Sequence, residues 1–234
     1  MGASLSSRAN DIIEIWFQDA EQIKDPVTYV LDRPLVDEPG TSFNYSGGNM
    51  NVLGEIIRYA TGMGIYEFSK NYLFEPLGID PFDWSTYESG VFEAGGGLEM
   101  TSRDMVKIGV TFLNNGVWNG KQIISEQWVE KSASPYAGNH GINIPGEDSG
   151  RVGYSYSWWT KQYPESGSQL SCRSSNSVGK TNLYYAGGWG GQHIMVIPEL
   201  NAVVVFTGGN YLTFRPPFKI LENYVIPAIN SNNV

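Results

Sequence analysis

A glycine-rich stretch near the C-terminus, Tyr184 to Pro198, has the composition of a site that stabilises negative charge. Two apolar runs flank a short polar turn at Pro198 to Asn201, which predicts a hairpin of two largely buried strands. Glycines at the entrance to the first strand let a ligand approach the backbone closely, and a row of backbone N–H groups there can hold a developing oxyanion. The alternative is that these glycines only form a bend or a bulge.

Other residue types that can do chemistry have simpler interpretations. His193 follows the glycines on the predicted strand, and we expect a strand-surface histidine rather than a base. Cys172 lies in a polar, serine-rich stretch and is expected to be inert. Ser102 is interpreted as part of a helix start, and Trp158-Trp159 as packing on the sheet, with a substrate-stacking wall as the alternative.

Composition limits the classes of partner. The chain has 234 residues and a formal net charge of -9, which argues against nucleic acid and anionic membranes. No metal site is predicted, because there are two histidines and one cysteine and no zinc-ligand spacing. No cofactor motif is present. No apolar run is long enough for a membrane span, and Met1 to Asn10 does not have the pattern of a signal peptide, so the compartment is left open.

The elements that must position these residues follow from periodicity, caps and turn signals. Helices come first, antiparallel strands next and a helix last, which predicts an α+β fold in which helices flank an antiparallel sheet. We expect a single domain over 1–234, with a helical part at about 10–133 and a sheet with a C-terminal helix at about 150–230. Helices are predicted at 10–18, 27–31, 50–60, 65–74, 101–113, 125–130 and 214–229, a hairpin at 117–124 and a strand at 152–160.

Four stretches, taken in order, resemble the serine β-lactamase-like superfamily, which includes class C β-lactamases, penicillin-binding DD-peptidases, esterases and nylon-oligomer hydrolases. They are Glu38–Ser46, Leu53–Ile57, Ala94–Met105 and Gly188–Gln192. The resemblance extends from Val27 to the C-terminus and implies a β-lactamase/transpeptidase-like fold. It also implies a serine hydrolase that works through an acyl-enzyme.

Two of the three sequence boxes of that family can be carried over. The resemblance implies that Tyr45 is the proton-shuttling tyrosine of the second box, with Gly47 where an asparagine usually stands. A glycine has no side-chain donor for a substrate amide, which favours ester substrates. Trp189-Gly190-Gly191 matches the third box, on the edge strand, in the form typical of the esterase branch. The backbone N–H that forms half of the oxyanion hole then maps to Gln192.

The first box, Ser-x-x-Lys, supplies the nucleophile in that family and lies upstream of the tyrosine box. No such spacing occurs between Met1 and Tyr45. We therefore expect an N-terminally incomplete domain whose nucleophile is unassigned. Ser177 and Lys180 are the one Ser-x-x-Lys pair, but they follow the tyrosine box and Gly179 is a poor helix former, so they are a weak candidate.

Two functions remain open at this point. The first is a serine hydrolase acting on small ester or amide substrates. The second is a catalytically inactive remnant that serves as a binding module or associates with itself. A sheet that lacks strands exposes an edge, and exposed edges recruit partners, so a homo-oligomer formed through a sheet edge is the interaction that we expect.

Overall fold

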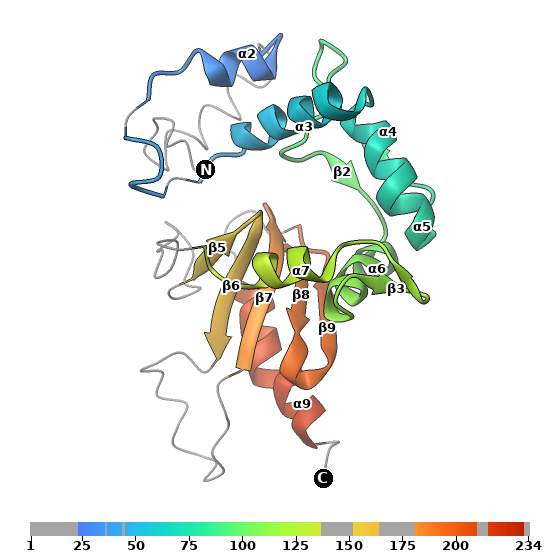
Figure 1. Cartoon of the computed structure of the whole chain (residues 1–234). Helices are drawn as coiled ribbons and strands as arrows, with labels where there is room; N and C mark the ends of the chain where they lie inside the picture. The colour runs from blue at the N-terminus through green and yellow to red at the C-terminus, as the bar shows by residue number, and fades with distance from the viewer. Residues whose placement is uncertain are drawn as a thin grey trace. The chain divides into compact units, whose positions relative to one another are not determined.

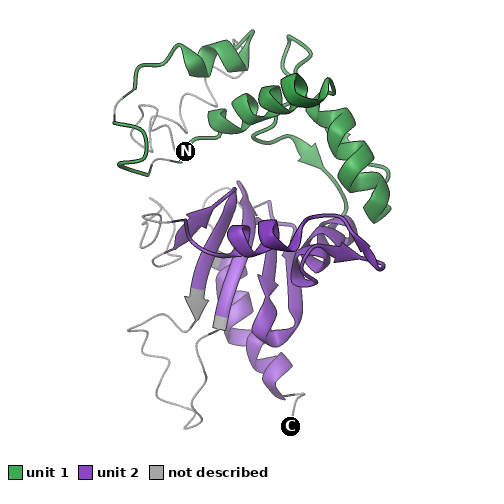
Figure 2. Ribbon diagram, in the orientation of Figure 1, with its two compact units in different colours: residues 1–101 green, residues 102–234 purple. Residues whose placement is uncertain are grey.

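The computed structural model describes residues 23–35, 37–43, 45–136, 152–163, 181–209 and 215–231. The chain divides into two compact units, residues 1–101 and residues 102–234 (Figure 2). The helix predicted at 10–18, Cys172, and the pair Ser177 and Lys180 lie outside the described residues.

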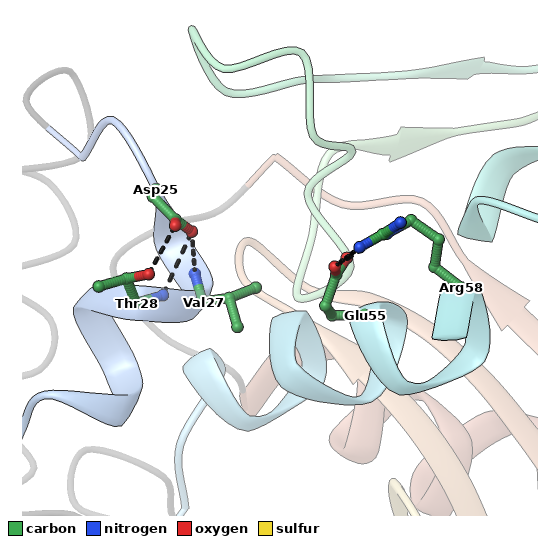
Figure 3. A network of polar contacts seen from close by, with 5 residues as sticks. All are labelled: Asp25, Val27, Thr28, Glu55 and Arg58. Carbon is green, nitrogen blue, oxygen red and sulfur yellow. Dashed lines mark hydrogen bonds and ion pairs between the residues drawn. The ribbon is translucent and has the colours of Figure 1, made fainter. Parts of the chain in front are cut away.

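The first described helix of the first unit is the short α2, Pro26–Leu31, whose start is set by one aspartate. Asp25 Oδ1 accepts hydrogen bonds from the backbone N–H groups of Val27 at 3.0 Å and Thr28 at 3.2 Å (Figure 3). The Thr28 hydroxyl donates to Asp25 Oδ2 at 2.6 Å. These hydrogen bonds lower the pKa of Asp25. The aspartate cap and the proline at the first helical position confirm the predicted helix start.

Helix α3, Gly48–Thr61, packs on α2 and ends at Gly62 in the left-handed conformation, as predicted. On its outer surface Arg58 pairs with Glu55 one turn earlier (Figure 3). Leu53 and Ile56 lie on the exposed side of this helix, where they are 49% and 54% exposed. The buried face carries the small or polar residues Gly48, Asn51 and Gly54.

An aromatic cluster forms the centre of the rest of this unit. The predicted helix at 65–74 is present as α4 (Ile65–Ser69), the π-helical turn η1 (Lys70–Phe74) and α5 (Glu75–Leu77), and it ends at Gly78. Strands β1 (Asp83–Trp84) and β2 (Leu98–Glu99) pair antiparallel beside it. The rings that contact one another belong to Tyr66, Phe74, Phe82, Trp84 and Phe92.

The second unit is organised by a five-stranded antiparallel sheet with the order β5-β6-β7-β8-β9 (Figure 1). Consecutive strands are neighbours, and each pair is antiparallel. The predicted hairpin around Pro198–Asn201 is confirmed: it joins β8 to β9 through the 3₁₀ turn η3, Pro198–Leu200. Only β8 is largely buried as predicted, because every residue of β9 is partly exposed. The strands are β5 (Gly153–Ser155), β6 (Trp158–Tyr163), β7 (Thr181–Gly188), β8 (Gln192–Ile197) and β9 (Ala202–Phe206).

The single strand predicted over Val152 to Thr160 is instead two strands. A two-residue turn at Tyr156 and Ser157, with φ of 44° and 71°, reverses the chain between β5 and β6. Two successive positive φ angles are the geometry of a tight hairpin turn, which usually selects glycine or asparagine. Tyr156 and Ser157 are neither glycine nor asparagine. The alternating aromatic pattern therefore gave no signal of a turn.

Helices cover one face of the sheet. The predicted helix behind Thr101 is α6 (Ser102–Leu113), and Ser125 caps α7 (Glu126–Ala133) by accepting from the Trp128 N–H. Between them, β3 (Val117–Trp118) and β4 (Lys121–Gln122) form the predicted hairpin at Asn119-Gly120. The core below these helices consists of Phe112, Val129, Trp158, Tyr184, Ile194 and Val196.

The opposite face of the sheet is covered by the C-terminal helix, which runs as α8 (Arg215–Ile220), the π-helical turn η4 (Leu221–Val225) and α9 (Ile226–Ser231). Its Phe218 ring meets the Tyr185 ring edge-on at a centroid distance of 5.1 Å. Tyr185, Met195 and Leu221 are almost fully buried. With helices on both faces of an antiparallel sheet, the α+β prediction is confirmed.

Two further findings concern the predicted organisation. Helices α6 and α7 belong to the same compact unit as the sheet, not to the unit that holds the preceding helices; the single domain over 1–234 stays a prediction. Within the part of the chain that the structure describes, none of the helices has the length and apolar character needed to cross a bilayer.

Helix α6 lies unusually close to the sheet at Gly109. A Cβ atom added there would be 2.5 Å from Val203 Cγ1 and 2.9 Å from Ile194 Cγ2. We expect Gly109→Ala to lower the free energy of unfolding by about 1–3 kcal/mol, because overpacking outweighs the higher helix propensity of alanine. Urea unfolding followed by circular dichroism measures the change.

Gly64→Ala is the matched control for this variant. Gly64 is the N-cap residue of α4 and has nothing within 4 Å of an added Cβ, so the same substitution there causes no overpacking and should cost about 1 kcal/mol or less. Equal stability of the Gly109 and Gly64 variants would contradict the close packing of α6 on β8 and β9.

Candidate functional site

The residues proposed from the sequence fall in both units. Tyr45 and Gly47 lie in the first unit, immediately before and at the start of α3, where Gly47 is the N-cap residue. Trp189, Gly190, Gly191 and Gln192 lie in the second unit. The structure brings the members of each group together within their own unit.

Tyr45 precedes the helix with 47% of its surface exposed. Desolvation nevertheless raises the pKa of its hydroxyl above the ordinary value. Tyr45 therefore carries its proton at neutral pH, and its hydroxyl is able to donate one hydrogen bond and accept another.

The glycine loop at Ala94–Gly97 lies against this tyrosine segment. A Cβ atom added to Gly95 would be 2.9 Å from the Gly47 carbonyl oxygen, so the two backbones are in direct contact. Gly97 has a φ of 68° and passes the Ser85 side chain, which an added Cβ would meet at 2.7 Å. Two of the stretches that carried the family resemblance are thus neighbours in space.

Asn51 fastens this loop to α3 from a position that is 2% exposed. Its Nδ2 donates to the Tyr87 hydroxyl at 3.0 Å, and its Oδ1 accepts from the Ala94 N–H at 3.0 Å. Burial raises the pKa of Tyr87 to about 12, so the tyrosine stays neutral in this network. The indole N–H of Trp84 donates to the carbonyl oxygens of Glu93 at 2.9 Å and Gly96 at 3.0 Å, which holds the other side of the loop.

The third box lies in a tight turn rather than on an edge strand. Trp189-Gly190-Gly191 connects β7 to β8, both interior strands of the described sheet, and Gly190 and Gly191 have φ of 98° and 90°. Such angles favour glycine, because a Cβ would clash with the backbone. The Gln192 side chain donates to the Gly208 carbonyl at 2.8 Å and so ties the turn to the segment after β9. Trp189 is 40% exposed and is not a core residue.

His193 is not a surface residue, and the expectation from the sequence is wrong on this point. It is 1% exposed and packs between aromatic rings, with centroid distances of 5.8 Å to Tyr185 and 5.2 Å to Phe218. Its Nδ1 has no hydrogen-bond partner among the described residues. Burial lowers the pKa of the imidazole, although a hydrogen bond with the Gly191 backbone opposes this shift.

Sequence reasoning missed three residues that organise these segments: Asn51, Tyr87 and His193. The spacing of Gly48, Asn51 and Gly54 at every third position marks one helix face of small and polar residues, and this was the available signal for Asn51. Alternation places His193 on the same face as Met195 and Ile197, which the period-2 pattern could have shown. Tyr87 offered no signal in a chain with 14 tyrosines.

Trp158, Trp159 and Ser102 are placed as predicted. Trp158 packs on Phe112 at a centroid distance of 4.3 Å, and Trp159 packs on Tyr154 at 4.6 Å, so both serve the sheet core. Ser102 is the first residue of α6. Among the described residues, no group of three histidine, cysteine, aspartate or glutamate side chains is placed to hold a metal ion.

An antiparallel sheet with helices on both faces, a tyrosine before a helix and a glycine turn between interior strands together define a β-lactamase-like hydrolase fold. The Beta-lactamase family model matches residues 9–211, and the chain belongs to this family.

Two comparisons give the extent of the similarity to individual proteins. The 6-aminohexanoate-dimer hydrolase of Paenarthrobacter ureafaciens is 34% identical over 109 residues, which are 45% of this chain and 28% of that protein. A putative 6-aminohexanoate-dimer hydrolase from Bacillus anthracis superposes with a TM-score of 0.71 at 23% identity, over 100% of this chain and 58% of that one.

A penicillin-binding protein from Bacillus halodurans superposes with a TM-score of 0.62 at 16% identity, over 97% of this chain and 70% of that one. At such identities the solved structures establish the fold, and the β-lactamase/transpeptidase-like prediction is confirmed. The chain thus spans well under two thirds of the length of the two hydrolases that it matches.

The Asn51 network can be tested by a double-mutant cycle. Asn51→Ala leaves the Tyr87 hydroxyl and the Ala94 N–H without their partner, and we expect a loss of about 1–3 kcal/mol in the free energy of unfolding. Combining it with Tyr87→Phe should cost less than the sum of the two single changes, because they share one hydrogen bond. Additive losses, measured by urea unfolding, would show that the two residues do not interact.

His193 predicts a specific pH dependence of stability. Its pKa is lower in the folded state than in the unfolded chain, where it is about 6.5. Below that pH the unfolded state binds a proton that the folded state does not bind. The free energy of unfolding therefore falls as the pH decreases, by at most about 1.4 kcal/mol per pH unit. His193→Gln should flatten this dependence between pH 7 and 5 in thermal unfolding. The same measurement on His140→Gln gives the contribution of the other histidine in the sequence.

Proposed function

We propose that this chain acts as a serine hydrolase that cleaves small esters or amides through an acyl-enzyme. Membership of the Beta-lactamase family supports the reaction class. The single observation that carries the assignment of a catalytic role is the position of Tyr45 directly before α3, in the segment against which the Ala94–Gly97 loop packs. The nucleophile is unassigned, and Ser177 with Lys180 is the first pair to examine.

In the proposed reaction a serine hydroxyl attacks the substrate carbonyl, and its proton passes through Tyr45 to the leaving group. The carbonyl oxygen becomes an oxyanion, which backbone N–H donors such as that of Gln192 stabilise. The acyl-enzyme is then hydrolysed by water. The backbone next to that donor is shaped by Trp189, Gly190 and Gly191. The two glycines have positive φ angles and directly precede the donor.

The kind of substrate rests on two opposing arguments. Gly47 provides no side-chain donor for a substrate amide, which supports esters. The relatives named 6-aminohexanoate-dimer hydrolase support an amide-like substrate. Rates with p-nitrophenyl acetate and with the 6-aminohexanoate dimer separate the two.

A second candidate function is a non-catalytic binding or self-associating module. The observation that favours it is that the one Ser-x-x-Lys spacing in the sequence, at Ser177 and Lys180, follows Tyr45 instead of preceding it. Fluorophosphonate labelling of the purified chain, followed by peptide mass spectrometry, distinguishes the two functions. Label on one serine supports the hydrolase and identifies its nucleophile, whereas an unlabelled chain supports the binding module.

Tyr45→Phe tests the role of the tyrosine. Loss of the hydroxyl removes the proposed proton path, so we expect turnover of p-nitrophenyl acetate to fall by about 10²-fold or more. Tyr59→Phe is the matched control, because Tyr59 is a 79% exposed tyrosine on the following helix, and its turnover should be unchanged. Equal turnover in both variants would remove Tyr45 from the mechanism.

A further inference from the structure

The turn between β7 and β8 lies against the segment that follows β9. A Cβ atom added to Gly208 would be 2.6 Å from the Gly190 carbonyl oxygen and 2.9 Å from the Gly191 carbonyl oxygen. No side chain can come so close to a backbone oxygen without a shift of one of the two segments. The two backbones therefore touch here because residue 208 is a glycine.

The C-terminal helix forms a second contact with the same turn. The Cβ position of Gly191 lies 3.7 Å from Pro217 Cγ on α8 and 3.9 Å from Gly208 Cα. Gly190 and Gly191 are buried, although they belong to a turn and have no side chains of their own. The inner side of the turn is thus lined by Gly208 and Pro217.

The Gln192 side chain links the same segments with a directional contact. Its Nε2 donates to the Gly208 carbonyl at 2.8 Å. Its Oε1 lies 2.9 Å from the position that a Cβ atom of Gly188 would occupy, so the side chain extends across the last residue of β7. One side chain therefore connects the end of β7, the start of β8 and the segment after β9.

The orientation of the Gln192 N–H follows from these contacts. A trans peptide group is planar, and its N–H points in the direction opposite to its C=O. The Gly191 carbonyl faces Gly208, so the Gln192 N–H points away from Gly208. Any displacement of the Gly191 carbonyl turns this N–H with it, because both belong to one rigid peptide plane.

We propose that Gly208 and the Gln192 side chain are positioning groups, which hold the Gly191–Gln192 peptide in the orientation that lets its N–H stabilise the oxyanion. This inference rests on the proposed hydrolase function, in which that N–H is a donor. Gly208 acts through its lack of a side chain, and the Gln192 amide acts through its hydrogen bond to the Gly208 carbonyl. The oxyanion forms only along the reaction, so the effect falls on kcat and not on KM.

Gly208→Ala tests the proposal in the hydrolysis of p-nitrophenyl acetate. The new methyl group displaces the turn, and we expect kcat to fall by about 10-fold or more with KM nearly unchanged, since small misplacements of a donor are costly. Gly209→Ala is the matched control and should keep the wild-type kcat. Among the described residues, no atom lies within 4 Å of a Cβ added to Gly209.

Alanine is compatible with the backbone at both positions, because neither Gly208 nor Gly209 has a positive φ. The two variants therefore differ in what the added methyl group meets and not in backbone strain. Equal values of kcat in the two alanine variants overturn the proposal.

Gln192→Ala tests the other contact and adds no atom, so it decides the matter where Gly208→Ala fails to fold. Loss of one hydrogen bond to the turn should lower kcat by about 3- to 10-fold. In combination with Gly208→Ala the loss should be smaller than the product of the two single losses, because both changes disturb one contact. A wild-type kcat in Gln192→Ala, or losses that multiply, would overturn the shared role.

Hydrogen exchange separates this inference from the proposed function, because it requires no active enzyme. Mass spectrometry of the peptide that covers Trp189 to Gln192 should show faster amide exchange in Gly208→Ala than in the wild type or in Gly209→Ala. Unchanged exchange in Gly208→Ala overturns the proposal, whatever the activity of the wild type. A wild type that neither hydrolyses esters nor takes the fluorophosphonate label refutes the hydrolase, and the exchange then decides alone whether Gly208 holds the turn.

Discussion

The close contact between the α6 backbone and strands β8 and β9 is the constraint on which the sheet unit depends. It exists because Gly109 has no side chain at the point where Val203 and Ile194 rise from the sheet. The approach brings Phe112 and its neighbours onto Trp158 and Tyr184, which closes the core on that face. Once this face is closed, β8 is held in a fixed position, and the Trp189–Gly191 turn that precedes it is held as well.

In the first unit the equivalent role belongs to a polar side chain. Asn51 satisfies a tyrosine hydroxyl and a backbone N–H that are otherwise buried without partners. An apolar residue of similar size would leave both groups unsatisfied. These hydrogen bonds also fix the position of the glycine loop, which lies against the segment that carries Tyr45 and Gly47. Stability and placement of the proposed catalytic tyrosine therefore depend on the same hydrogen bonds.

The two outer strands of the described sheet differ in their surroundings. At β5 the Tyr136 N–H donates to the Tyr154 carbonyl, whereas β9 packs against α6. The inward face of β9 must be apolar to form the core with α6, and a run of three valines meets that need.

The amino-acid sequence by itself determined the class of fold, most element boundaries and the family. A cap or a turn is a local interaction within a few residues. Local signals therefore predicted the helix starts at Asp25 and Ser125, the helix ends at Gly62 and Gly78, and the turn at Asn119-Gly120. Only the tertiary structure decided which faces are buried. Leu53 and Ile56 are exposed while Asn51 is buried, and His193 is enclosed by Tyr185 and Phe218, since burial depends on residues that are distant in the chain.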